Sequence, residues 1–581
     1  MRLDHESYSA EIGEDSISVF LKGRRYAGLK IASAVDTVAG KDLDGPLSQP
    51  EVSRCEDGVE ITWRAKSSVW EEKTYHWRFE PDAIVCRVSV LGAGEVTDVR
   101  FFASGEDWSF FDFSRFFTPE CSLLDQRYWK SMQYGCIDAS SGQMSEFALD
   151  ENANHHWIFT PPPFCYSLGF SSGPWLAAGI APEPGQYNFT RFEYRPKGDS
   201  FCFRLTYDGK TRVEAMRREA LCPDASSGAR VCVGAECPPT HTRVNGTWHA
   251  PAFVFRPAED EYSALAKYCD MLRAWRVVGE SKHERADWWS RPMFCGWGEQ
   301  NIIAGRRGVR PQDVATQADY DRFIGLIAEK RLSPGTIIID DKWQKTYGTC
   351  EVDGEKWPDL RGWIDARHVE GRKVLLWYGA WCPEGLEPDE CLANDQGHRP
   401  TCDPTSPAYQ ARIGPMLHRM LSPDDGCYNA DGIKYDWTGV PVDPALQPQG
   451  DQWGVEMFKT YTKLIYDAAK AAKPDALVIT HTANPYFAEC TDMVRLNDIH
   501  AGTRELADMM THRQRIARVA CPHALVDCDN SSATTHTEWL DYMRVQPSLG
   551  VPSLYYLTAL FPTYEPITDA DWDELAHIWR R

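Results

Sequence analysis

Several acidic side chains in the sequence share one position, directly after a short apolar stretch: Asp340, Asp341, Asp436 and Asp498. Paired carboxylates suit glycoside chemistry, in which one attacks the anomeric carbon and the other protonates the leaving oxygen. Lys434 stands two residues before Asp436, so on an extended strand both side chains point to the same side. An ammonium group there would keep Asp436 ionised, which a nucleophile requires.

The elements that would position these side chains follow a strand-then-helix pattern. Segments with helical periodicity lie between the apolar stretches. The clearest of them is residues 451–473, and Pro474 ends this helix. Eight such units over about 290 residues predict a (β/α)8 TIM barrel, whose active site lies where the strands end. Trp297 and Trp377 stand at the same rim. The predicted strands are residues 292–297, 336–340, 374–378, 432–436, 476–480, 493–496, 524–526 and 553–556.

The residues before the barrel carry a different pattern, in which apolar and polar side chains alternate with period two. Gly, Pro, Asn and Asp interrupt these stretches at short intervals, which is typical of a large antiparallel β-sandwich. We therefore expect a multidomain β plus α/β protein. Its predicted parts are an N-terminal β-sandwich domain at 1–250, a helical linker at 251–290 and a catalytic (β/α)8 barrel at 291–581.

The composition argues against several classes of function. The net charge of −22 disfavours a nucleic-acid partner, which basic clusters would bind. The 19 cysteines form no CxxC pair or tight Cys/His cluster, so we expect reduced thiols and no metal site. The sequence has no 18-residue apolar run and no N-terminal signal pattern. We expect a cytoplasmic protein with no membrane partner. The sequence does not determine its oligomeric state, and a homo-oligomer is one alternative.

Three motifs in the barrel region carry a resemblance to a known family. The segment from Asp340 to Trp343 is similar to a DDGW or DDCW motif, residues 434–436 match K-x-D, and Arg495 shortly precedes Asp498. These motifs resemble those of the melibiase-type α-galactosidases, glycoside hydrolase clan D with families 27 and 36, over residues 290–530. Family 36 members also place a large β-domain before the barrel.

The resemblance implies a retaining α-glycosidase and favours an α-galactosidase. Asp436 would be the nucleophile that forms a covalent intermediate, and Asp498 would be the acid/base. The partner would be an oligosaccharide or glycoside substrate, with no cofactor and no metal. The residues expected to bind the substrate are Asp340, Asp341, Lys434, Trp297, Trp377, Arg495 and Asn484. Asp340 and Asp341 would hold sugar hydroxyls, and Trp377 would supply a stacking wall.

The sequence departs from the family where the sugar 2-position is expected to be recognised. A Cys-x-x-Gly-x-x-Arg segment of family 36 is replaced here by Thr-His-Thr-Ala-Asn-Pro at residues 480–485. The sugar is therefore open, with an α-N-acetylgalactosaminide, an α-glucoside or an anionic sugar as alternatives. A basic loop predicted at residues 305–310 would meet an anionic group or simply be solvated. The sequence carries no counterpart of the C-terminal β-domain usual in the family, and truncation and natural absence both remain open as the reason.

Other functions remain alternatives to hydrolysis of an α-galactoside. A raffinose-synthase-type α-galactosyl transferase would keep both acids and replace water by an acceptor sugar. A non-catalytic carbohydrate-binding protein would have the barrel without the reaction. A metal-dependent barrel hydrolase fits less well, because no His-x-His sequence follows the first strand.

Overall fold

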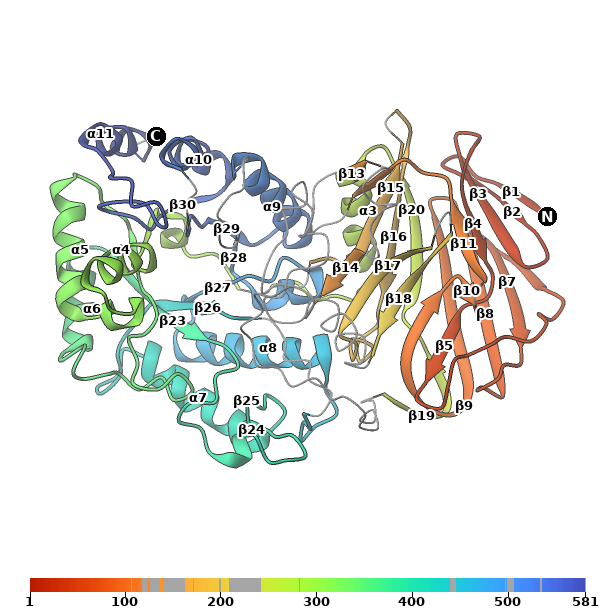
Figure 1. The fold of residues 1–581 in the computed structure, drawn as a ribbon, viewed down its shortest axis with the longest axis horizontal. Helices are drawn as coiled ribbons and strands as arrows, with labels where there is room; N and C mark the ends of the chain where they lie inside the picture. The colour runs from red at the N-terminus through yellow and green to blue at the C-terminus, as the bar shows by residue number, and fades with distance from the viewer. Residues whose placement is uncertain are drawn as a thin grey trace.

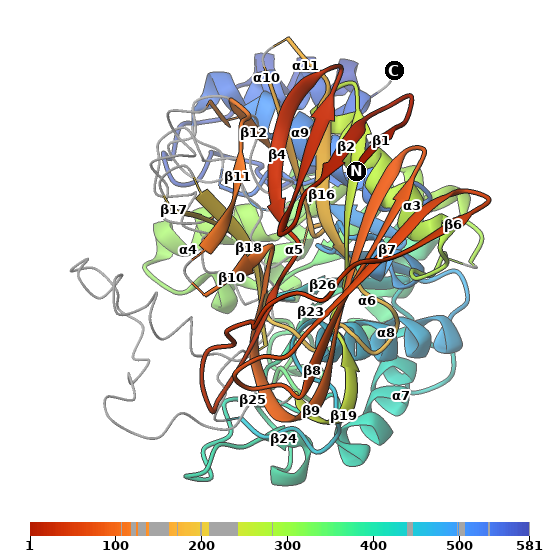
Figure 2. The same ribbon diagram turned by 90° about the vertical axis from the view of Figure 1, so that its right-hand side faces the viewer.

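The chain folds into an antiparallel β-sheet part followed by a closed parallel barrel, which confirms the predicted fold class (Figure 1). A computed structural model describes residues 1–105, 107–117, 124–125, 135–138, 162–170, 172–197, 200–207, 242–281, 283–438, 446–496, 498, 506–532 and 535–579. Viewed from the sheet side, the strands lie in front of the barrel (Figure 2).

Period-two burial accounts for the strands of the N-terminal part. Every second side chain is buried in β3 (Ser16–Leu21) and β8 (Glu72–Glu80). The other strands are β1 (Arg2–Asp4), β2 (Ser9–Ile12), β4 (Arg24–Lys30), β5 (Ala34–Thr37), β6 (Glu51–Cys55), β7 (Gly58–Ala65), β9 (Ala83–Phe101), β10 (Ala103–Ser104), β11 (Asp107–Phe111), β12 (Arg115–Phe117), β13 (Leu124–Asp125), β14 (Gly135–Asp138), β15 (Cys165–Gly169), β16 (Trp175–Ala181), β17 (Arg191–Lys197), β18 (Ser200–Thr206), β19 (Arg243–His249) and β20 (Ala252–Ala258).

The 19-residue strand β9 joins two sets of neighbours. Its first part pairs with β8, β19 and β20, and its last residues pair with β5 and β18. One long strand therefore ties the antiparallel part together. The sheet also extends past residue 250, since β20 is paired along its length with β16.

Eight parallel strands close the barrel in chain order, and the first pairs with the last. They are β21 (Met293–Cys295), β22 (Thr336–Ile339), β23 (Lys373–Gly379), β26 (Gly432–Asp436), β27 (Leu477–Thr480), β28 (Met493–Arg495), β29 (Leu525–Cys528) and β30 (Val551–Leu554). A small hairpin of β24 (Cys391–Leu392) and β25 (Thr401–Cys402) lies outside the barrel sheet.

Helices with identifiable caps connect the strands. Ser406 caps α7 through the Tyr409 amide, and Pro407 occupies its first position, where a missing N–H costs nothing. The helices are α3 (Glu261–Ala274), α4 (Trp297–Arg307), α5 (Gln317–Glu329), α6 (Leu360–Val369), α7 (Pro407–Leu421), α8 (Gly454–Ala472), α9 (Leu506–Ala520), α10 (His536–Leu549) and α11 (Asp569–Ile578), with short turns η2 (Asp287–Ser290), η3 (Pro311–Val314), η4 (Pro388–Glu390) and η5 (Pro485–Cys490). No helix among the described residues is long and apolar enough to cross a bilayer.

The two parts of the chain share a contact at the start of α8. This helix has no side-chain cap; instead the amides of Val455 and Glu456 donate to the carbonyls of Phe189 and Tyr187, each at 3.0 Å. Gly454 has φ +56°, and a Cβ there would lie 2.1 Å from the Phe189 carbonyl oxygen, so only glycine allows this approach. The antiparallel part therefore caps a barrel helix.

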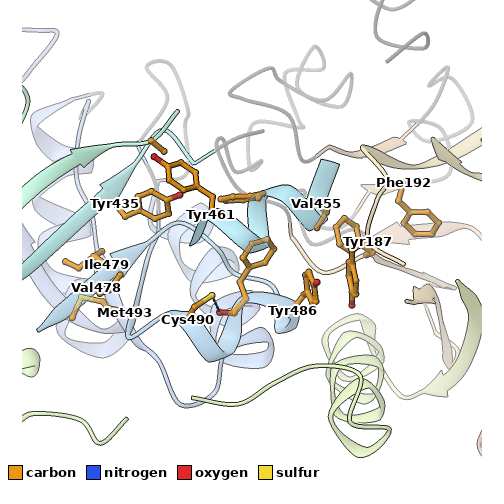
Figure 3. Packing of buried hydrophobic residues seen from close by; sticks show 14 of the residues in the cluster. Tyr187, Phe192, Tyr435, Val455, Tyr461, Val478, Ile479, Tyr486, Cys490 and Met493 are labelled. Carbon is orange, nitrogen blue, oxygen red and sulfur yellow. Dashed lines mark hydrogen bonds between the residues drawn. The ribbon is translucent and has the colours of Figure 1, made fainter. Parts of the chain in front are cut away.

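An aromatic pair strengthens the same contact. The rings of Tyr187 and Tyr486 are stacked, with centroids 3.5 Å apart and planes 5° from parallel (Figure 3). Tyr486 belongs to η5, which follows β27 on the barrel side. The Asn484 amide at the start of η5 also donates to the Pro162 carbonyl at 2.8 Å. The segment after the fifth barrel strand is thus held from both parts of the chain.

Candidate active site

The register of the barrel strands decides which side chains face its interior. Residues paired directly across parallel strands point to the same face, and Trp377 pairs with Lys434 while Arg495 pairs with Asp527. At the carboxyl ends of the strands, this face brings together the side chains of Asp340, Trp377, Asp436, His481, Arg495 and Asp529. They come from six different strand ends, as a barrel active site requires.

Arg495 is the centre of the arrangement. Its Nη1 lies 3.2 Å from Asp436 Oδ2, its Nη2 donates to Asp498 Oδ1, and its Nε donates to Asp529 Oδ2. One buried guanidinium therefore contacts three carboxylates and fixes their relative positions. The acids at the ends of β26 and β28 bind adjacent nitrogens of this guanidinium, which keeps the two carboxylates close together.

Asp436 accepts hydrogen bonds on both carboxylate oxygens. Trp377 Nε1 donates to Oδ2 at 3.0 Å, the Trp437 amide donates to Oδ1 at 2.8 Å, and His481 Nε2 lies 2.9 Å from Oδ1. Burial alone would raise the pKa of Asp436, but Arg495 and the His481 hydrogen bond outweigh it and hold the pKa well below its usual range. Asp436 is therefore ionised at neutral pH.

Asp498 is perturbed in the opposite direction. Burial raises its pKa to about 6; the charge of Arg495 opposes this shift, and the nearby charges of Asp529 and Asp436 reinforce it. Its side chain remains 31% exposed, so a leaving group has access to it. Two carboxyls whose pKa values are driven apart are the usual basis for separate acid and base roles in one site.

A second pair of acids, Asp340 and Asp341, directly follows β22. Asp340 accepts from Lys434 Nζ at 2.7 Å and from Cys295 Sγ at 3.0 Å. Asp341 accepts from Tyr347 and from Gln312, at 2.8 and 2.9 Å. Burial nevertheless raises the pKa of Asp341 to about 6. These groups alternate donors and acceptors, which is the chemistry that binds sugar hydroxyls.

Lys434 acts on a different acid from the expected one. Its ammonium is paired with Asp340 and is 1% exposed, and among the charges that lower the Asp436 pKa it ranks behind Arg495 and His481. The Asp340 carboxylate raises the pKa of Lys434 against the effect of burial, so the lysine stays charged. The same-face argument for Lys434 and Asp436 is consistent with the ladder, but the electrostatic partner of Asp436 is Arg495.

Trp377 is placed differently from the expected stacking wall. It is 1% exposed and packs against Trp437 and Tyr347, with ring centroids 4.9 and 5.7 Å away. Its indole N–H instead holds Asp436. At 1% exposure the ring offers no open surface on which a sugar could stack.

Asn484 and Trp297 lie at the starts of helical elements. The Asn484 side chain caps η5 and binds the Pro162 carbonyl, so it is engaged in two main-chain hydrogen bonds. Because these contacts hold the main chain, we assign Asn484 no role in sugar binding. Trp297 is the first residue of α4 and is partly buried.

The predicted basic loop at residues 305–310 is mostly the end of a helix. Arg306 and Arg307 belong to α4, where they bind Thr558 and Asp319 respectively, and Gly308 ends the helix with φ +68°. Arg310 pairs with Asp313 at 2.8 Å. Helical periodicity continues through the arginines, and the glycine that suggested a loop is a helix C-cap.

His481, Tyr347 and Gln312 were not identified as site residues from the sequence. His481 stands in the unfamiliar segment after β27, so its position offered a signal. Asp529 directly follows β29, and the sequence pattern of an acid after an apolar strand places it at the same rim. Tyr347 lies in a loop and Gln312 in the short helical turn η3, where spacing carries no such signal. Among the described residues, no group of three or more His, Cys, Asp or Glu side chains is arranged to hold a metal ion.

Asp527, inside the barrel below Asp529, is expected to make stability depend on pH. It is fully buried, and neither carboxyl oxygen makes a hydrogen bond of normal geometry with a described residue. Burial, reinforced by Asp529, raises its pKa to about 7. The folded state therefore keeps a proton that the unfolded chain releases above about pH 4, and stability falls by about 1.4 kcal/mol per pH unit up to about pH 7.

Asp527→Asn removes this titration. The melting temperature of Asp527→Asn minus that of the wild type should therefore increase from pH 5 to pH 8. The increase corresponds to at most about 2 to 3 kcal/mol of unfolding free energy. Thermal unfolding of both proteins across this pH range measures the difference. A melting-temperature difference that stays constant over the range would contradict the raised pKa.

Comparison with known proteins finds relatives in structure only. No family model and no curated protein matches the chain. Solved structures of similar fold include a family 31 glycoside hydrolase, a sulfoquinovosidase from E. rectale (TM-score 0.60, 10% identity, 98% of this chain and 82% of that chain). An α-N-acetylgalactosaminidase from Bifidobacterium bifidum gives a TM-score of 0.60 with 11% identity, over 100% of this chain and 92% of that chain.

An α-galactosidase from Thermus thermophilus, in complex with stachyose, gives a TM-score of 0.52 with 13% identity, over 91% of this chain and 99% of that chain. At such identities the likeness establishes the fold alone. The architecture expected from the clan D resemblance is confirmed: the chain has the fold of these α-glycosidases, a β-rich part followed by a (β/α)8 barrel.

Proposed function

We propose that the protein is a retaining α-glycosidase that acts on a terminal α-linked sugar, with an α-galactoside as the expected substrate. One observation carries the proposal: Arg495 binds Asp436 and Asp498 together, while their pKa values are driven in opposite directions. An ionised acid beside a protonatable one is the pair that retaining hydrolysis requires.

In the proposed reaction, Asp436 attacks the anomeric carbon and forms a covalent glycosyl intermediate. Asp498 donates its proton to the leaving oxygen and then takes a proton from the attacking water, so that the configuration is retained. Retention needs carboxyls about 5 to 5.5 Å apart, and inversion needs about 6.5 to 9.5 Å. Binding of both acids to adjacent nitrogens of one guanidinium supports the shorter separation.

The sugar is proposed to bind opposite the reacting pair. Asp340 with Lys434, and Asp341 with Tyr347 and Gln312, offer acceptors and donors for its hydroxyls. The three similar folds are described as a sulfoquinovosidase, an α-N-acetylgalactosaminidase and an α-galactosidase, so the fold is compatible with different substituents. The galactose preference rests on the DD and K-x-D motifs.

Hydrolysis of a panel of aryl α-glycosides tests the proposal. We expect turnover of the α-galactoside, with the α-N-acetylgalactosaminide, α-glucoside and α-sulfoquinovoside as the alternatives to compare. NMR of the first product should reveal the α-anomer. Turnover confined to β-glycosides, or a β-anomer as first product, would contradict the proposal.

The same panel separates the rival functions. A transferase of the raffinose-synthase kind would release aryl groups faster when an acceptor sugar is added and would form a new glycoside. A non-catalytic carbohydrate-binding protein would bind sugars without releasing any aryl group. The transferase and the hydrolase share both proposed catalytic acids, so only the products distinguish them.

A further inference from the structure

A buried arginine outside the reacting groups contacts the segment that carries Asp498. Arg513 lies on α9, is fully buried, and its Nη1 donates to the carbonyl of Leu496 at 2.8 Å and to the carbonyl of Asp498 at 3.0 Å. These two carbonyls flank a single residue. The guanidinium therefore fastens the main chain of Asp498 to that of Leu496, the residue that follows β28.

The charge of Arg513 is retained in this setting. Burial lowers its pKa to about 10, while neighbouring groups, including Asp529 and Asp498, oppose the shift. The side chain is thus a cation at any pH at which the enzyme would work. Hydrogen bonds from a charged donor are stronger than those from a neutral one, so the main chain at Leu496 and Asp498 is held firmly.

The choice of acceptor matters for the chemistry. Arg513 binds the carbonyl oxygen of Asp498, while Arg495 binds its carboxylate. A second cation placed on the carboxylate would stabilise its ionised form and oppose the raised pKa that a proton donor needs. A cation on the carbonyl fixes the position of the residue and leaves the carboxyl able to hold a proton.

We propose that Arg513 is a positioning residue for the proton donor, which holds the main chain of Asp498 so that its carboxyl meets the leaving oxygen. The inference rests on the proposed function, in which Asp498 is the acid/base. Proton transfer depends steeply on placement, because donor and acceptor must come within hydrogen-bond reach in the transition state. Loss of the Arg513 contacts should therefore impair proton donation more than sugar binding.

Dependence on the leaving group tests this role. In Arg513→Met, kcat/KM for an unactivated phenyl α-glycoside should fall about 10- to 100-fold, within the contribution of a general acid. For the 2,4-dinitrophenyl glycoside of the same sugar, kcat/KM should stay within about threefold of the wild type, since this leaving group departs without a proton. Arg513→Lys keeps one charged nitrogen, so its kcat/KM for the phenyl glycoside should lie between that of the wild type and that of Arg513→Met.

Arg515→Met is the matched control. Arg515 stands two residues further along α9, is exposed, and lies over the Tyr262 ring at 4.8 Å. It should leave both substrates unaffected. If Arg513→Met fails to fold, the ratio of the two substrates in Arg513→Lys decides instead. Equal losses on both substrates would overturn the inference alone, whereas a wild type inactive on every α-glycoside would overturn the proposed function with it.

Discussion

Asp436→Asn is expected to lower kcat/KM by roughly 10⁴-fold or more on every substrate that the wild type accepts. The amide is neutral and cannot attack the anomeric carbon, so the covalent route is lost whatever the leaving group. Asparagine has nearly the same shape and keeps an oxygen for the Trp377 indole or the Trp437 amide. The fold should therefore survive, although Arg495 loses one of its three carboxylates.

The measurement combines kinetics with covalent labelling. A mechanism-based cyclitol epoxide of the accepted sugar should add its mass to the wild type, on the peptide that contains Asp436, and should not label Asp436→Asn. Asp425→Asn, at an exposed aspartate after α7, is the control and should behave as the wild type. Labelling of another residue would refute the assignment of the nucleophile, and wild-type turnover by Asp436→Asn would do the same.

Asp498→Asn is the second large effect, and its size should depend on the substrate. General acid catalysis contributes about 10² to 10⁴, so kcat/KM for a phenyl α-glycoside should fall by that factor. A 2,4-dinitrophenyl glycoside needs no proton for departure and should react at nearly the wild-type rate in the first step. Hydrolysis of the intermediate should then be slow, because no base activates the attacking water molecule.

Azide and pH provide independent readouts for Asp498. Azide attacks the intermediate without a base, so it should restore turnover of the activated substrate by Asp498→Asn and yield a glycosyl azide of α-configuration. In the wild type, the pKa of about 6 predicts that kcat/KM falls as pH rises above about 6, because the donor loses its proton. Uniform loss on all leaving groups, with no response to azide, would argue against an acid/base role.

The strand ends and their acids could be predicted because local pattern determines them. A parallel barrel strand is a mostly apolar run, and an aspartate marks the end of both β22 and β26, so Asp340 and Asp436 were placed correctly at these strand ends. The helix predicted at residues 451–473 is α8 (Gly454–Ala472), since its apolar period and the Pro474 that follows it are local signals.

Contacts between distant segments were not predictable in the same way. Nothing in the residues around Arg495 says that one guanidinium meets three carboxylates, because Asp436 and Asp529 come from other strands. His481 looked like part of a divergent loop, yet it touches Asp436 directly. The spacing of Trp377 placed it at the rim but could not show that Trp437 and Tyr347 pack against it and that it is buried.

The cap that the antiparallel part supplies to α8 has a consequence for the order in which the chain can assemble. Synthesis proceeds from the N-terminus, so the Tyr187 and Phe189 carbonyls exist long before the amides of Val455 and Glu456 that they bind. The barrel, in contrast, closes through the pairing of Met293 with Ser553, near its two ends. The antiparallel sheet can therefore fold first, during synthesis, and bind the start of α8 when about half of the barrel has been made. The barrel itself can close only after its last strand has been synthesised.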